Sequence, residues 1–110
     1  MEIDVRVSGK ALPIIVDNPH KLDIDAVVGK IESFLSSHGA QARGLDFRGL
    51  LPKMVHGVAG CEGGCPANAK SLVAKGFGSF KLEYIEGGIL QAQAKTAEGK
   101  DVSLRMFPDF

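Results

Sequence analysis

Three short alternating runs in the last third of the chain constrain its fold most. Apolar residues take every second position in each run, which is the pattern of a strand with one buried face. Gly87-Gly88 separates the first two runs and Gly99 lies between the last two, and such glycines favour tight hairpin turns. We therefore predict an antiparallel three-stranded meander. Its inward positions are Phe80, Leu82 and Tyr84, then Leu90, Ala92 and Ala94, then Val102, Leu104 and Met106.

The first 16 residues predict a second hairpin. Ile3, Val5 and Val7 alternate with charged residues, a turn follows at residues 8–10, and a second apolar run covers residues 12–16. Proline has no N–H to give to a sheet, so Pro13 predicts that the second strand lies at an edge.

The clearest helix covers residues 23–38. Apolar residues recur at three- and four-residue spacing, Asp23 is suited to cap the start, and Gly39 to end the helix. Gly29 in its interior costs up to about 1 kcal/mol relative to alanine. We therefore interpret Gly29 as a mark of close packing.

Residues 39–64 hold half of the 14 glycines of the chain. Leu51, Met54 and Val58 have helical spacing, and Pro52 fits the first turn of a short helix. A glycine-rich structured loop is the alternative, and loops of this length in compact domains are usually functional or mobile.

A second helix is predicted for residues 66–75. Cys65 would be its N-cap, Pro66 its first residue and Gly76 the residue after its end. Phe77 would then contact Leu72 across the end of the helix.

Strands and helices are segregated along the chain instead of alternating, which indicates an α+β fold. Residues 1–110 form one domain in this interpretation. It contains an antiparallel sheet, made of the N-terminal hairpin and the C-terminal meander, and two main helices behind it.

The charge balance excludes one broad class of function. The chain has 13 Lys and Arg against 13 Asp and Glu, so its formal net charge is zero. Non-specific nucleic-acid binding depends on a cationic surface, so a general nucleic-acid binder is not expected. No signal peptide and no stretch of bilayer-spanning length is recognisable, so we expect a cytoplasmic protein with reduced thiols.

The only two cysteines, Cys61 and Cys65, lie four residues apart in a glycine-rich turn. Structural zinc sites use closely spaced cysteine pairs and need four ligands. Cys61, Cys65 and His56 supply three candidates, and the fourth would come from Glu62, water or another chain. A homo-oligomer or a protein partner would then complete the site.

Iron is the second candidate metal. The Cys61–Pro66 spacing resembles the end of the bacterial ferredoxin run C-x2-C-x2-C-x3-C-P, and also the start of the radical-SAM motif C-x3-C-x2-C. Val55, Val58 and Asn68 stand where further cysteines would be needed. A complete cluster held by this chain alone is therefore not expected.

Reversible thiol chemistry is a third interpretation of the cysteines. A thiolate at the start of a helix is stabilised by the helix dipole, which makes Cys65 the candidate reactive thiol. Cys61 would be its resolving partner, provided that the two Cα atoms come within about 7 Å. The plain alternative is that both are small buried apolar residues.

The start of the same helix is also a candidate anion site. The free amides of Ala67 and Asn68 and the shape of Gly63-Gly64 suit an anion. The basic residues that would close over it are Arg43, Arg48 and Lys53. Ordinary solvated surface charges are the alternative for these three.

The leading hypothesis is thus a small non-catalytic module that binds a metal or reacts reversibly through Cys61 and Cys65, assisted by His56. The alternative is a protein-interaction or assembly domain that uses an edge strand or a loop. A thiol-dependent enzyme ranks third. Carboxylates that such an enzyme would use are Asp46, Glu83 and Glu86, which are otherwise ordinary polar residues.

Overall fold

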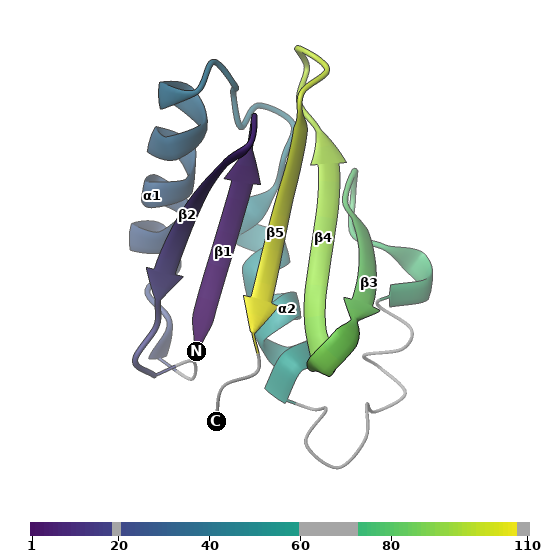
Figure 1. Ribbon diagram of the computed structural model, residues 1–110. Coiled ribbons are helices and arrows are strands. Elements are labelled where there is room, and N and C mark those ends of the chain that lie inside the picture. Colours follow the sequence, from purple (N-terminus) through teal and green to yellow (C-terminus); the bar gives the residue numbers. More distant parts are fainter. Residues whose placement is uncertain (19–20, 60–72, 108–110) are drawn as a thin grey trace.

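The computed structural model describes residues 1–18, 21–59 and 73–107 of the chain (Figure 1). The fold is α+β, as predicted: a five-stranded antiparallel sheet and two main helices. The elements in chain order are β1 (Glu2–Val7), β2 (Lys10–Ile15), α1 (Ile24–Ser37), α2 (Phe47–Ala59), β3 (Lys81–Ile85), the 3₁₀ turn η2 (Glu86–Gly88), β4 (Ile89–Lys95) and β5 (Asp101–Phe107).

The strand order is β2-β1-β5-β4-β3, and every neighbouring pair is antiparallel. The N-terminal hairpin and the C-terminal meander are both confirmed, and the pairing of β1 with β5 joins them into one sheet. β2 lies at an edge, as Pro13 predicts. Ser8 and Gly9 form its turn, both with positive φ, which matches the right-handed twist of a two-residue hairpin.

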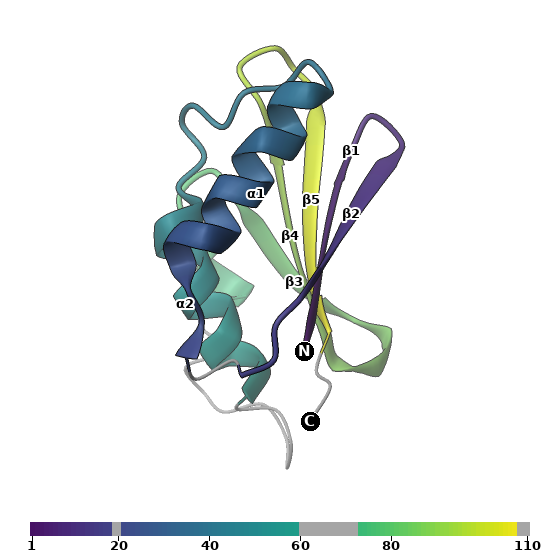
Figure 2. The ribbon, with the colours of Figure 1, turned by 90° about the vertical axis from the view of Figure 1, so that its left-hand side faces the viewer.

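The two helices cover one face of the sheet only, as Figure 2 shows in side view. The core lies between them and the sheet. From the strands it takes the predicted alternating residues, among them Ile3, Val5, Leu82, Leu90 and Leu104, each at most 2% exposed. This agrees with the period of two in each run.

α1 begins and ends where the sequence predicts. The Asp23 carboxylate accepts a hydrogen bond from the Ala26 amide at 3.1 Å, and Gly39 has the positive φ of a residue beyond a helix end. The interpretation of Gly29 was wrong. Gly29 is exposed, and a Cβ at this position would have open space around it.

The sequence left open whether residues 39–64 contain a short helix or form a glycine-rich loop. The structure shows a helix, α2, within this segment. It is a helix of 13 residues, and Pro52 is its sixth residue, not part of its first turn. The helix starts earlier because Asp46 caps it: its side chain accepts the Gly49 amide at 3.0 Å. A proline at this depth removes one helical hydrogen bond. The buried residues of the helix that offset this cost are Phe47, Leu50, Leu51, Met54 and Val58.

The helix predicted for residues 66–75 falls mostly outside the described part of the chain. Residues 73–75 are helical, and Gly76 follows with φ +71°, as expected of a residue beyond a helix end. A tight turn follows, in which Phe77 and Phe80 exchange backbone hydrogen bonds of 3.1 and 2.8 Å. The expected contacts of Cys65 and Leu72 lie outside the described residues.

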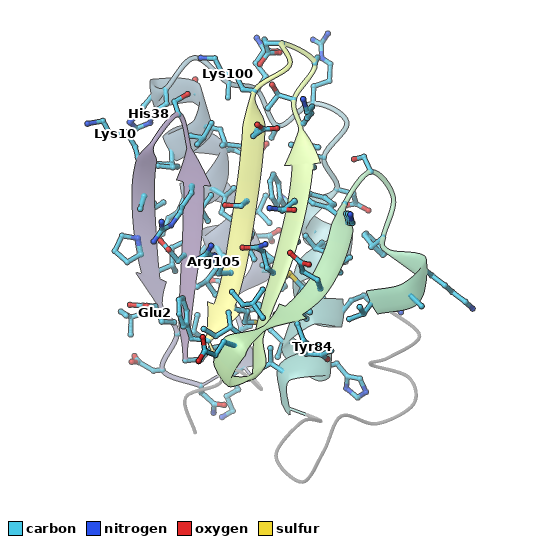
Figure 3. The ribbon with its side chains drawn as sticks, turned by 45° about the vertical axis from the view of Figure 1, so that its right-hand side comes forward. Glu2, Lys10, His38, Tyr84, Lys100 and Arg105 are labelled. Atoms are coloured by element: carbon cyan, nitrogen blue, oxygen red, sulfur yellow. The ribbon has the colours of Figure 1, made fainter. Side chains whose placement is uncertain are left out.

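The loop between β4 and β5 holds the end of α1 in place. Lys100 donates from Nζ to the His38 carbonyl at 2.9 Å. The Glu98 carboxylate accepts a hydrogen bond from the backbone N–H of Gln41 at 3.0 Å. Figure 3 shows Lys100 and His38 together at this end of the molecule. Because a cation at a helix C-terminus satisfies its unpaired carbonyls, this contact ties the helix layer to the sheet.

No described helix has the length and apolar character that crossing a membrane requires.

Candidate functional site

Most of the residues predicted to carry chemistry lie outside the described part of the chain. They are Cys61, Gly63, Gly64, Cys65, Ala67 and Asn68. The metal, thiol and anion hypotheses that rest on them therefore stay predictions. Within residues 1–18, 21–59 and 73–107, no three His, Cys, Asp or Glu side chains gather as a metal site would require.

His56 is exposed in the last turn of α2, five residues before Cys61. This last turn is anchored to the sheet, because the Tyr84 hydroxyl on β3 donates to the Gly57 carbonyl at 3.2 Å. Burial raises the pKa of Tyr84 above its ordinary value of 10. The anchor therefore fixes the backbone that precedes the cysteine turn.

The three basic residues predicted to close over an anion have different surroundings. Arg48 forms an ion pair with Asp25 of α1. Lys53 is exposed on the same helix as Arg48 but five residues later, which points it about 140° away around the helix axis. Arg43 is exposed in the loop before α2. Their approach to residues 66–68 stays a prediction.

The carboxylates considered for catalysis have structural contacts. Asp46 is the N-cap of α2, and Glu83 accepts a hydrogen bond from Gln91 on the neighbouring strand at 3.0 Å. Glu86 is exposed in the turn η2.

A surface that the sequence interpretation missed is the sheet face opposite the helices, here called the open face. No described helix covers it (Figure 2). The pairing register arranges its side chains in rows across the strands. The middle row is Asp4, Arg105, Gln91 and Glu83 on β1, β5, β4 and β3.

The middle row is an ordered polar network. Arg105 donates from Nε to Gln91 at 2.7 Å, and Gln91 donates in turn to Glu83. Gln91 is 5% exposed and Asp4 7% exposed, although both lie on the face that the helices leave uncovered. Figure 3 shows Arg105 at the centre of this face. These hydrogen bonds link side chains of three neighbouring strands across the face.

The row above it, toward the turn between β1 and β2, is Arg6, Ser103, Gln93 and Lys81. No carboxylate belongs to this row, which lines a broad hollow of about 1100 Å³. We call this the basic hollow. Arg6, Lys81, Lys95 and Lys100 are its cationic residues, and Asp101 is its carboxylate.

The opposite end of the open face is largely apolar. Its row across the strands is Ile15, Glu2, Phe107, Ile89 and Ile85, so four apolar residues and one carboxylate lie there. Ile15 is 68% exposed, the one large apolar residue of the described chain exposed to this degree.

The same alternation that predicted the buried residues also predicts that the residues between them lie on the open face. The sequence did not supply the register, and only the register brings Arg6 level with Lys81 three strands away. Comparisons with protein-family models, with curated proteins and with solved structures found no match to this chain.

Proposed function

We propose that this chain is a non-catalytic protein-interaction domain that binds a partner through the open face of its sheet. The observation that carries the proposal is the division of this face into a basic end, a hydrogen-bonded polar middle and a largely apolar end. Protein interfaces combine apolar contacts with charged and hydrogen-bonding groups in this way, and arginine and aromatic residues are enriched in them. An exposed isoleucine at the edge of the sheet, on the same row as the half-buried Phe107 and Ile89, adds apolar surface that a partner could cover.

Lysine-directed cross-linking with mass spectrometry tests the proposal, because the two faces carry separate lysines. Lys81 and Lys95 lie on the open face, while Lys30 and Lys53 are exposed on the helices and serve as internal controls. The full chain would be cross-linked in a cell extract, and each linked partner identified and then reproduced with purified protein. We expect partner cross-links at Lys81 and Lys95. Cross-links to the reproduced partner at Lys30 and Lys53 instead would refute the proposal.

The thiol module remains a second proposal. It is favoured by the helical turn at residues 73–75 and the positive φ of Gly76, which agree with the predicted end of the helix that Cys65 would begin. In a Cys61→Ser variant, alkylation of Cys65 is expected to reach half its maximal rate well below pH 8.5, the approximate pKa of an ordinary thiol. A midpoint near pH ~8.5 would show that the Cys65 thiolate is not stabilised, and would contradict the proposal of a reactive thiol. Native mass spectrometry of protein purified without oxygen tests for bound zinc or iron.

A further inference from the structure

The basic hollow lies at one end of the open face, where four strands and two turns contribute to it. Its floor is the row Arg6, Ser103, Gln93 and Lys81, and Ser8 and Gly9 of the first hairpin turn stand at its rim. The hollow is broad and shallow. It therefore suits a segment lying across the strands better than a small molecule held in a closed cavity.

Lys81 is the cation most available to a ligand. It is exposed on the edge strand β3, and it forms no ion pair or hydrogen bond with any residue that the structure describes. Lys95 is only loosely held, since its Nζ lies 3.8 Å from the Asp101 carboxylate and both side chains are largely exposed. Lys100 is different, because its Nζ is bound to the end of α1.

Arg6 is held in position for binding. Its Nε donates to the Asp4 carboxylate at 2.9 Å, and Asp4 is almost fully buried in the middle row. A guanidinium carries further N–H donors beyond the one on Nε, and no described residue accepts a hydrogen bond from them. Arg6 lines the hollow with these donors available, and paired guanidinium donors are the groups that arginine uses to bind a carboxylate.

The spacing of the two ends of the row matches a peptide. Arg6 and Lys81 are three strand spacings apart, about 14 Å in total. Carboxylates four residues apart in an extended chain are about 13 Å apart. Ser103 and Gln93 lie between the two cations and offer hydroxyl and amide groups to the backbone of such a chain.

We infer that the basic hollow binds an extended acidic segment of a protein partner, with two carboxylates four residues apart that pair with Arg6 and Lys81. This inference rests on the proposed function and names the kind of partner. A nucleic acid fits less well, because Asp101, Asp4 and Glu83 border the row and would repel an unbroken line of phosphates. Charged side chains on a peptide can be spaced to avoid these carboxylates.

Isothermal titration calorimetry with synthetic peptides tests the inference. The probe is a 12-residue peptide of serine and threonine that carries glutamate at two positions four residues apart, and its matched control has uncharged glutamine at both positions. Lys81→Glu reverses the charge in the hollow, and Lys53→Glu makes the same change on the exposed surface of α2. Both substitutions leave the core untouched, so both variants should fold.

We expect the glutamate peptide to bind the wild-type chain and Lys53→Glu with the same affinity to within about twofold. Lys81→Glu should bind it at least about tenfold more weakly, and salt should weaken the wild-type complex, since the contacts are ionic. The glutamine peptide should bind the wild-type chain no more tightly than the glutamate peptide binds the Lys81→Glu variant.

Three results would overturn the inference: equal binding of the glutamate and glutamine peptides, equal loss in Lys53→Glu and Lys81→Glu, or tighter binding of a single-stranded oligothymidylate of the same charge. The interaction-domain proposal would survive them if partner cross-links still fall on Lys81 and Lys95. It would fail separately if those cross-links fall on Lys30 and Lys53.

Discussion

Tyr84 shows how one side chain joins two layers of the molecule. Its hydroxyl donates to the Gly57 carbonyl in the last turn of α2, which links the strand β3 to the helix layer. The aromatic ring packs against the core from β3. Sequence alternation predicted the inward position of Tyr84, but its hydrogen bond depends on a helix end 27 residues away and had no local signal.

We predict that the Tyr84 hydroxyl titrates at a higher pH in the folded chain than in the unfolded chain. Burial raises its pKa, so the folded state disfavours the tyrosinate. The contribution of Tyr84 to stability is therefore complete below pH 10 and is lost as the pH rises through its higher folded pKa. Tyr84 is the only tyrosine and the chain has no tryptophan, so tyrosinate absorbance reports this residue alone. We expect a higher midpoint in the native chain than in urea.

Tyr84→Phe provides the matched control. Loss of the hydrogen bond should lower the free energy of unfolding by about 1 kcal/mol at neutral pH. The decline in stability above pH 10 should also be smaller in the variant than in the wild type. A native midpoint at or below that of the unfolded chain would contradict this description of Tyr84.

At the scale of the elements, α1 and α2 show when local signals suffice. In α1 the capping residue, the apolar period and the terminal glycine all indicate the same helix, and Asp23 is its N-cap as the sequence predicts. In α2 the glycines and Pro52 argue against a helix, and the burial of one face against the sheet outweighs them. Local propensity therefore predicted one helix and left the other open.

The cap of α2 is the testable part of this explanation. Asp46→Ala removes the hydrogen bond to the Gly49 amide and should lower the free energy of unfolding by about 1 kcal/mol, within a range of 0.5–2. Asp46→Asn keeps a capping oxygen and should retain most of the stability. Urea unfolding, followed by far-ultraviolet circular dichroism, measures both. An alanine variant as stable as the wild type would show that Asp46 does not determine where α2 begins.

At the scale of the whole molecule, the pairing of β1 with β5 creates the surface that we assign to binding. It places Glu2 beside Phe107, near the two ends of the chain. Alternation predicted which residues of each strand share a face, and this part of the prediction is confirmed. The order and register of the strands depend on packing between distant segments, so the rows of the open face could not be predicted from the sequence.

We propose that this protein binds its partner through the open face, and within that face through the basic hollow. Amide chemical-shift mapping by nuclear magnetic resonance, with the glutamate peptide added to the ¹⁵N-labelled chain, is the experiment that tests this proposal. The predicted result is that the largest shifts fall on Arg6, Lys81, Gln93 and Ser103, while the exposed residues of α1 and α2 stay unchanged. Shifts confined to the helices, or the same shifts with the glutamine peptide, would contradict the account.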